Sequence, residues 1–147
     1  MALFLVDRTT PLRPEEAWRR LTDWERHGRV VPLTRVTVGL AGTPTAGAGA
    51  RFTARTGVGP LAFDDPMEVV VWRPPTVGRT GVCRLVKHGT AVTGWAEIEV
   101  GPEGSGARVL WREELRVRWL PRRADPLVAR LGPVVFGRAV DALLGSG

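Results

Sequence analysis

The chain has 147 residues and a net charge of +6, and 20 of its 21 basic residues are Arg, while Asn, Gln and Tyr are absent. With 44% hydrophobic and 24% charged residues it has enough apolar material for a core, which excludes a disordered chain and predicts one domain over residues 1–147. The single cysteine, Cys83, excludes an internal disulfide. Because only two His accompany it, no metal site and no cofactor are expected.

The basic charge does not come with a nucleic-acid-binding motif, since neither a helix-turn-helix pattern nor an RNA-recognition signature is present. An excess of Arg, Ala, Gly and Val over Lys, Asn, Tyr and Ile is typical of coding bias in a GC-rich genome. We therefore expect no nucleic-acid partner. The apolar run near the N-terminus is too short for a signal peptide or a membrane span. A cytoplasmic protein without a membrane span is expected.

The first part of the chain predicts one strand and two short helices. Residues 2–9 have the composition of a strand. Pro14, followed by Glu15 and Glu16, predicts the start of a helix, because Pro is tolerated in the first turn and acidic residues suit the positive end of the helix dipole. Residues 23–28 predict a second short helix that ends at a glycine.

From Thr34 to Leu120 the apolar residues alternate, which predicts antiparallel strands separated by turns rich in Gly and Pro. The first run contains Val36 and Val38 and leads into a loop at 39–49. The strands that follow are predicted at 50–57, 61–73, 79–87, 91–100 and 107–120. Asp125-Pro126 then predicts the N-terminus of a helix over 127–144, with a kink at Gly132-Pro133.

One consistent strand pairing places apolar residues on one face of the sheet and charged residues on the other. A two-residue turn at His88-Gly89 pairs Cys83 with Gly94, and a loop at 101–106 pairs Gly94 with Glu113. The outer face then brings together Glu68 with Arg84, Glu99 with Arg108, and Trp95 with Arg112. Such pairs account for many arginines without a polyanionic partner.

Four stretches of the chain resemble the START-like (SRPBCC) superfamily, namely WRRLTDW (18–24), VPLT (31–34), GARFTARTG (49–57) and DPMEV (65–69). They are most similar to bacterial members described as polyketide cyclase/dehydrase or lipid-transport proteins. The resemblance implies an α+β helix-grip fold. In that fold a curved seven-stranded antiparallel sheet wraps around a long C-terminal helix, two short helices lie between strands 1 and 2, and an apolar cavity lies between sheet and helix.

The same resemblance turns the inward-facing residues into candidates for the cavity lining, although each of them could instead simply fill the core. The candidates are Phe52, Phe63, Met67, Val69, Cys83, Leu85, Trp111, Glu113, Leu115, Leu131, Val135 and Phe136.

Glu113 interrupts an apolar inward series, where an unpaired carboxylate would be costly. It could hydrogen-bond a ligand hydroxyl or act as a general base, and we expect it to form a polar spot with Cys83 across Gly94. Alternatively it pairs with an inward arginine, or a bulge turns it to solvent. Cys83 itself should be inert, because burial raises the pKa of a thiol.

His27 is the second catalytic candidate, because it lies at the end of the second short helix, which borders the cavity mouth in this superfamily. It could gate or protonate a ligand, or be an ordinary surface histidine at a helix end.

No nucleophile elbow and no phosphate-binding loop is present, so the sequence assigns no catalytic residue. The expected function is binding or carriage of a small hydrophobic molecule that is lipid-like, aromatic or polyketide-like. One alternative is a cyclase or dehydratase with Glu113 as proton acceptor and His27 or an arginine polarising a carbonyl. Another is a protein-interaction module, including a homodimer, that uses Trp95 and the outer face of 108–118.

Overall fold

The structure, a computed structural model, describes residues 2–39, 42–44 and 46–145, so positions 40, 41 and 45 of the expected loop lie outside the described residues. Every expected strand and helix is present, with ends that differ from the expectation by at most three residues. The elements are β1 (Ala2–Thr10), α1 (Pro14–Leu21), α2 (Trp24–Val30), β2 (Thr34–Val38), β3 (Arg51–Thr56), η1 (Gly59–Leu61), β4 (Phe63–Arg73), β5 (Gly81–Lys87), β6 (Val92–Glu103), β7 (Gly106–Val117), η2 (Arg122–Ala124) and α3 (Asp125–Gly145).

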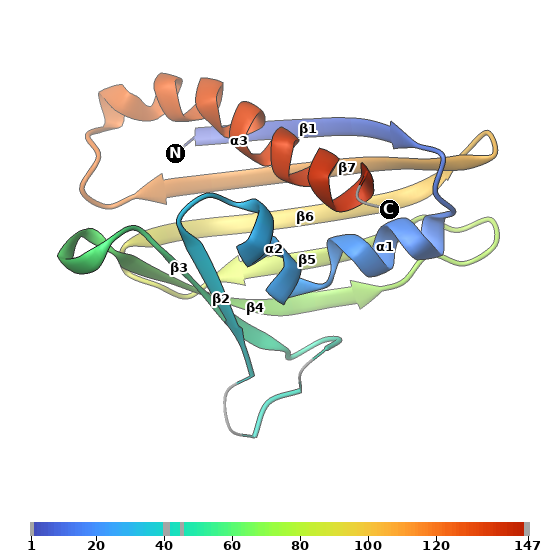
Figure 1. The fold of residues 1–147 in the computed structure, drawn as a ribbon, viewed down its shortest axis with the longest axis horizontal. Helices are drawn as coiled ribbons and strands as arrows, with labels where there is room; N and C mark the ends of the chain where they lie inside the picture. Colours follow the sequence, from blue (N-terminus) through green and yellow to red (C-terminus); the bar gives the residue numbers. More distant parts are fainter. Residues whose placement is uncertain (1, 40–41, 45, 146–147) are drawn as a thin grey trace.

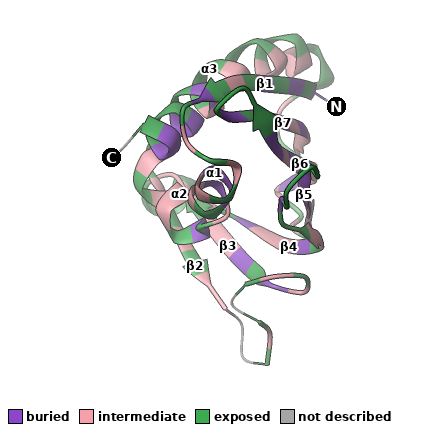
Figure 2. Cartoon of the chain, turned by 90° about the vertical axis from the view of Figure 1, so that its right-hand side faces the viewer, coloured by how far each residue is buried: buried purple, intermediate pink, exposed green. Residues whose placement is uncertain are grey.

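The strands form one seven-stranded antiparallel sheet in the order β1-β7-β6-β5-β4-β3-β2. The first two strands therefore lie at opposite edges, and α1 and α2 connect them across one face (Figure 1). Seen end-on, the sheet curls around the helices, which lie on its concave side (Figure 2). This is the helix-grip arrangement that the resemblance implied. Within the described residues, no helix is long and apolar enough to cross a membrane.

One end of the interior is filled by α1 and by the C-terminal half of α3. In α1, Ala17, Trp18 and Leu21 are buried, and Trp18 meets Trp72 of β4 edge to face with ring centroids 5.2 Å apart. In α3, the buried residues include Val140 and Leu143, which join the same core. These helical faces bury apolar surface at spacings of three and four residues, as an amphipathic helix on a sheet requires.

α3 continues through Pro133. The residues of α3 that face the sheet each lie one position after the ones that were expected to do so. A Cβ on Gly132 would lie 2.6 Å from the Phe4 ring of β1, so the missing side chain lets helix and strand approach closely. Phe136, one turn later, stacks on Phe4 with ring centroids 5.4 Å apart. The helix face that contacts the sheet therefore contains Gly132 and Phe136, and not Leu131 and Val135.

The expected strand registers around β6 are wrong, although the faces are mostly right. Cys83 lies opposite Ile98 and Glu113 lies opposite Ala96, whereas Gly94 was expected opposite both. Both connections differ in length from the expectation: residues 88–91 connect β5 to β6 where two residues were expected, and residues 104–105 alone connect β6 to β7 where six were expected. Each resulting shift is an even number of residues, and an even shift leaves every side chain on its original face.

Gly94 has a role other than leaving room for Glu113. Its φ is +133°, and a Cβ there would overlap the carbonyl oxygen of Glu114 on β7. Glycine is thus required by the close approach of two backbones in the curved part of the sheet.

A β-bulge in β4 changes the faces beyond it. The register with β5 shifts between Val69 and Val71, so that Trp72, and not Val71, lies opposite Cys83. An extra residue in one strand reverses the alternation that follows it. Trp72 consequently points inward, where it contacts Trp18.

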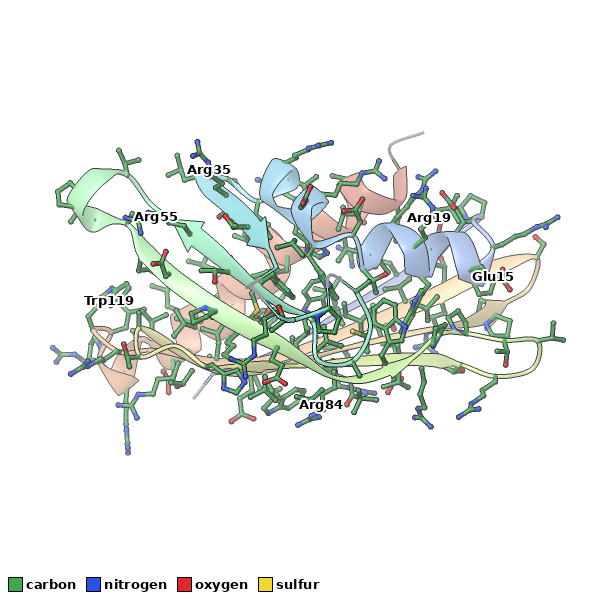
Figure 3. The ribbon with its side chains drawn as sticks, turned by 90° about the horizontal axis from the view of Figure 1, so that it is seen from below. Glu15, Arg19, Arg35, Arg55, Arg84 and Trp119 are labelled. Atoms are coloured by element: carbon green, nitrogen blue, oxygen red, sulfur yellow. The ribbon has the colours of Figure 1, made fainter. Side chains whose placement is uncertain are left out.

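The outer face of the sheet carries ion pairs, but with partners other than those expected. Arg84 pairs with Glu97 at 3.0 Å, and Arg112 pairs with Glu99 at 2.9 Å. The Arg84 guanidinium, not that of Arg112, covers the Trp95 ring at 4.5 Å from its centroid. The other two expected partners, Glu68 and Arg108, pair instead with Arg51 and with Asp7. Figure 3 shows Arg84 on this side, pointing away from the helices.

Candidate functional site

A cavity of about 110 Å³ lies between the concave face of the sheet, α2 and α3. It is at the end of the interior that α1 and the C-terminal half of α3 do not fill. Its lining is mostly apolar and comes from six of the seven strands and from both helices: Trp24, His27, Val31, Thr34, Val36, Phe52, Ala54, Thr56, Asp65, Met67, Leu85, Lys87, Ala96, Trp111, Glu113 and Phe136.

Aromatic rings in mutual contact form one wall of this cavity. Phe52 of β3 stacks on Trp24 of α2 with centroids 4.7 Å apart. His27 lies between Trp24 and Trp111, at 5.6 and 5.4 Å from their ring centroids. Trp111 in turn meets Phe136 of α3 at 5.9 Å. The rings join sheet and helices into a rigid apolar surface, of the kind that binds planar apolar groups.

Three charged side chains form a buried group on the sheet side of the cavity. Lys87, the last residue of β5 and the only lysine in the chain, places Nζ 2.6 Å from Asp65 Oδ2 and 3.2 Å from Glu113 Oε1. The side chains of Lys87 and Glu113 are 4% and 3% exposed. Asp65 comes from β4 and Glu113 from β7, so three strands build this group, which we call the carboxylate-lysine cluster.

Burial and ion pairing act against each other in the cluster. Burial raises the pKa of Glu113, and the nearby Lys87 ammonium only partly offsets this effect. Burial likewise raises the pKa of Asp65, again against the influence of Lys87. For Lys87, burial lowers the pKa but the two carboxylates outweigh it, so that the pKa is raised. Lys87 is thus a charged ammonium, and the two carboxyl groups hold protons more tightly than exposed ones would.

Each carboxyl group has one oxygen left over. Among the described residues, Asp65 Oδ1 and Glu113 Oε2 are buried without a well-formed hydrogen bond, and so is the Trp111 Nε1–H, which lies near enough to Glu113 to lower the pKa of that carboxyl group. Met67 Sδ, 3.6 Å from Nζ, is the third neighbour of the Lys87 ammonium and a weak acceptor. Buried polar atoms are nearly always partnered in folded proteins. The unpartnered oxygens therefore mark the cluster as a place where a ligand or an ordered water can supply hydrogen bonds.

His27 is buried in the cavity wall and not exposed at a helix end. Its Nε2 lies 2.6 Å from the Leu21 carbonyl oxygen, and because a carbonyl only accepts, Nε2 carries the proton and donates it. Burial lowers the pKa of His27, with the Leu21 hydrogen bond opposing. The ring is therefore neutral at pH 7.

The structure brings about half of the expected cavity residues together. Phe52, Met67, Leu85, Trp111, Glu113 and Phe136 line the cavity, and the candidate His27 joins them. The other expected residues lie elsewhere. Val69 and Cys83 are fully buried in the packed core, and Leu115 is half-buried and outside the cavity lining. Phe63 packs edge to face on Trp119, with ring centroids 5.0 Å apart.

The expectation that Leu131 and Val135 line the cavity is wrong, because these residues are 51% and 42% exposed. They share a helix face at spacing four, and that face was expected to point inward. Gly132 and Phe136, one residue further on, occupy the inward position and rotate the Leu131 face toward solvent. The large apolar side chains were therefore a poor guide to which face of α3 contacts the sheet.

The polar spot also differs from the expected one. Cys83 is buried in the core, and burial raises the pKa of its thiol to about 12. The partners of Glu113 are Lys87 and, through it, Asp65. The sequence held a signal for Lys87, because it follows Cys83 and Leu85 at spacing two on one strand, and it is the one lysine in an Arg-rich chain.

A larger groove of about 720 Å³ adjoins the cavity, and Val31 and Thr34 line both. Arg29, Arg35 and Arg55 lie along this groove, which we call the mouth groove. Figure 3 shows Arg35 and Arg55 at the same end of the molecule. Basic side chains therefore line the groove that borders the cavity. Among the described residues, no group of three His, Cys, Asp or Glu side chains could hold a metal ion.

No protein-family model and no curated protein matches the sequence. Solved structures do match. A START superfamily protein from Mycobacterium smegmatis has a TM-score of 0.73 at 11% identity, with 99% of this chain and 96% of that chain covered. The di-domain ARO/CYC protein StfQ from the steffimycin biosynthetic pathway has a TM-score of 0.69 at 11% identity, with 98% and 49% covered.

A norcoclaurine synthase point mutant from Thalictrum, in complex with a transition-state analogue, has a TM-score of 0.63 at 12% identity, with 97% of this chain and 91% of that chain covered. At such identities the likeness concerns the fold. The chain has the helix-grip fold of the START-like (SRPBCC) proteins.

Proposed function

We propose that this protein binds a small hydrophobic molecule in the cavity and carries or sequesters it. The observation that carries the proposal is a cavity with an aromatic wall and a buried polar cluster, inside a protein whose other end is densely packed. Apolar pockets with a few placed polar groups are the usual form of small-molecule sites. Removing apolar ligand surface from water supplies the affinity, and the polar groups orient the ligand.

The size of the cavity supports a small ligand. An apolar cavity of about 150 Å³ in another protein binds benzene. A cavity of about 110 Å³ is smaller, so it has room for at most one small ring or a group of similar size. A larger molecule would extend into the mouth groove, where arginines would meet any anionic part of it. A long acyl chain does not fit inside the cavity as it stands.

Native mass spectrometry of freshly purified protein tests the proposal and requires no assumption about the identity of the ligand. A hydrophobic compound that co-purifies and dissociates on unfolding would support it and give the ligand's mass. Apoprotein alone, with no change in tryptophan fluorescence on addition of small aromatics or fatty acids, would contradict it, because Trp24 and Trp111 line the cavity.

A cavity-filling variant makes the same test specific to this site. Ala54 lines the cavity, so Ala54→Leu should occupy its space and weaken binding at least about tenfold. The matched control is Thr53→Leu, on the adjacent residue of β3, whose side chain points to the opposite face of the sheet. Equal binding by the two variants would place the ligand elsewhere.

Catalysis of cyclase or dehydratase type in the same cavity is a second candidate, and one observation favours it. Glu113 is buried beside the cavity, its pKa is raised, and one of its oxygens is unpartnered, as suits a general acid or base. Comparing the compounds that co-purify with the wild type and with Glu113→Gln separates the two candidates. A carrier would hold a compound of the same mass in both proteins, in an equal or smaller amount in the variant, whereas an enzyme would leave unreacted substrate of a different mass in the variant.

We further propose a cytoplasmic location, which a single, buried and free cysteine supports, since secreted domains of this size more often contain disulfides. The homodimer stays a prediction. Trp95 has partners within its own chain, because Arg84 covers its ring and its Nε1–H donates to Glu114 at 3.2 Å. Sedimentation of the wild type and of Trp95→Ala tests whether this surface is used between copies.

A further inference from the structure

We propose that the ligand is a compound with a single aromatic ring and a hydrogen-bond donor, which binds the free oxygens of Glu113 and Asp65 in the carboxylate-lysine cluster. This inference rests on the proposed function and names the ligand class for that site. A hydroxyl group and an ammonium group share the required chemistry, and the experiment below distinguishes them.

The first argument is that the cluster offers acceptors. Lys87 is surrounded by Asp65 Oδ2, Glu113 Oε1 and Met67 Sδ, so its three protons are directed at the protein. Among the described residues, the unpaired oxygens of the cluster are Asp65 Oδ1 and Glu113 Oε2, and the one unpaired donor in the cavity lining, Trp111 Nε1–H, lies near Glu113. In its ionised form, which Lys87 favours, a carboxylate accepts hydrogen bonds and donates none. A ligand that satisfies these two atoms must therefore bring N–H or O–H groups.

The second argument is electrostatic. The cluster contains one ammonium and two carboxyl groups, so full ionisation leaves one negative charge that the cluster does not balance. The remaining charged groups near the cavity are on its exposed side, in the mouth groove, and His27 is held neutral. A carboxylate ligand would add a like charge next to the cluster, whereas a donor or a cation would stabilise the ionised form of Glu113.

The third argument is shape. The space of about 110 Å³ has room for at most one ring, and the rings of Phe52, Trp24, Trp111 and Phe136 line it. Flat aromatic walls favour a flat aromatic ligand, and their faces also attract a cation. The cluster lies in the same cavity lining, so one small molecule can contact both.

The experiment is calorimetric titration of the wild type with five probes of similar size. Toluene has no polar group, phenol is a neutral donor, benzylamine is a cationic donor, benzaldehyde has an acceptor alone, and benzoate is an anion. We expect phenol or benzylamine to bind at least about tenfold more tightly than toluene and benzaldehyde, and benzoate to bind least. The tighter of the two donors identifies the hydroxyl or the ammonium as the group recognised.

Variants assign the preference to the cluster. In Glu113→Gln the donor probes should bind about tenfold more weakly, and the affinity for toluene should not change. The substitution keeps the size of the side chain and removes its charge. The matched control is Glu114→Gln, whose carboxylate lies on the outer face beside Trp95 and should change nothing. Asp65→Asn provides a second variant of the cluster if Glu113→Gln does not fold. The titration of the wild type with the five probes tests the ligand class without either variant.

Two results would overturn the inference while leaving the proposed function intact: toluene or benzaldehyde binding as tightly as the donors, or benzoate binding best. Binding of donors that is equal in Glu113→Gln, Asp65→Asn and the wild type would also overturn it. If none of the probes bound and no compound co-purified, the proposed function itself would fail.

Discussion

The two faces of the sheet use charge in opposite ways. On the outer face, Arg84 and Arg112 pair with Glu97 and Glu99, and every partner is at least 20% exposed. On the inner face, Lys87 forms ion pairs with two carboxylates, and its side chain is 4% exposed. The same strands, β5 and β7, contribute to both groups, so alternation along a strand separates an exposed ion pair from a buried one.

This difference has an energetic meaning. Exposed pairs are screened by water and contribute about 0–1 kcal/mol each. A buried group has already lost its hydration, so removing one member leaves the others uncompensated. The outer ion pairs therefore contribute little stability, whereas the inner cluster carries a desolvation cost. Variants that break one face or the other test this contrast.

The largest effect is expected from Lys87→Met. It leaves Asp65 and Glu113 buried without a cation, and should lower the free energy of unfolding by about 3–5 kcal/mol at pH 7, measured by urea denaturation. The matched control is Arg84→Met on the same strand, which should cost at most about 1 kcal/mol. Equal losses in the two variants would contradict the contrast between the faces.

The Lys87→Met deficit should also depend on pH. Burial raises the pKa of Glu113 and Asp65 above the unfolded values, and losing Lys87 raises both further. A carboxyl group with a raised pKa in the folded state destabilises that state as pH rises above the unfolded pKa. The gap between variant and wild type should therefore narrow as the pH falls from 7 to about 4. A gap that stays constant would show that lost packing is the cause.

A smaller effect is expected from His27→Gln, which retains an N–H for the Leu21 carbonyl. Burial lowers the pKa of His27 below its model-peptide value of 6.5, so the unfolded chain takes up a proton before the folded protein does. This costs the wild type stability as pH falls below 6.5, by up to about 1.4 kcal/mol per pH unit, and the variant avoids it. Denaturation at pH 7.5 and 5.5 measures the difference, and parallel profiles would exclude a buried neutral His27.

On the outer face, Arg112→Ala should lower the free energy of unfolding by about 0–1 kcal/mol, and added salt should reduce even that. Its guanidinium is 3.4 Å from Glu97 and 2.9 Å from Glu99, in a partly exposed position. Denaturation of wild type and variant at low and high salt measures both effects. A loss of several kcal/mol would mean that this network is more desolvated than its exposure indicates.

The smallest perturbation is chemical and requires no variant. Cys83 lies in the packed core, and burial raises the pKa of its thiol to about 12, so a thiol reagent at pH 8 should not react with the native protein. Reaction should occur at the rate of unfolding when denaturant is added. Rapid native labelling would show that the core opens locally near β5.

The element order and the buried face of most strands could be predicted from the sequence, because both follow from local alternation and turn residues. Glu113 was identified for the same reason, as a carboxylate in an otherwise apolar series. The registers could not be predicted, since an even shift leaves the alternation unchanged and loop lengths alone select one pairing. The longer β5–β6 connection and the shorter β6–β7 connection moved Cys83 away from Glu113.

The sequence by itself therefore determined a helix-grip sheet with an apolar inner face, a charged outer face and an inward Glu113. The tertiary structure decided what Glu113 meets, because Lys87, Asp65 and Glu113 come from three strands whose registers depend on the loops between them. It also decided which face of α3 points inward, since a glycine beside Phe4 allows a closer approach than a leucine does. The alternation of apolar and polar residues along each strand determines which face of the sheet a side chain is on. Contacts between strands and helices determine which side chains meet at the site.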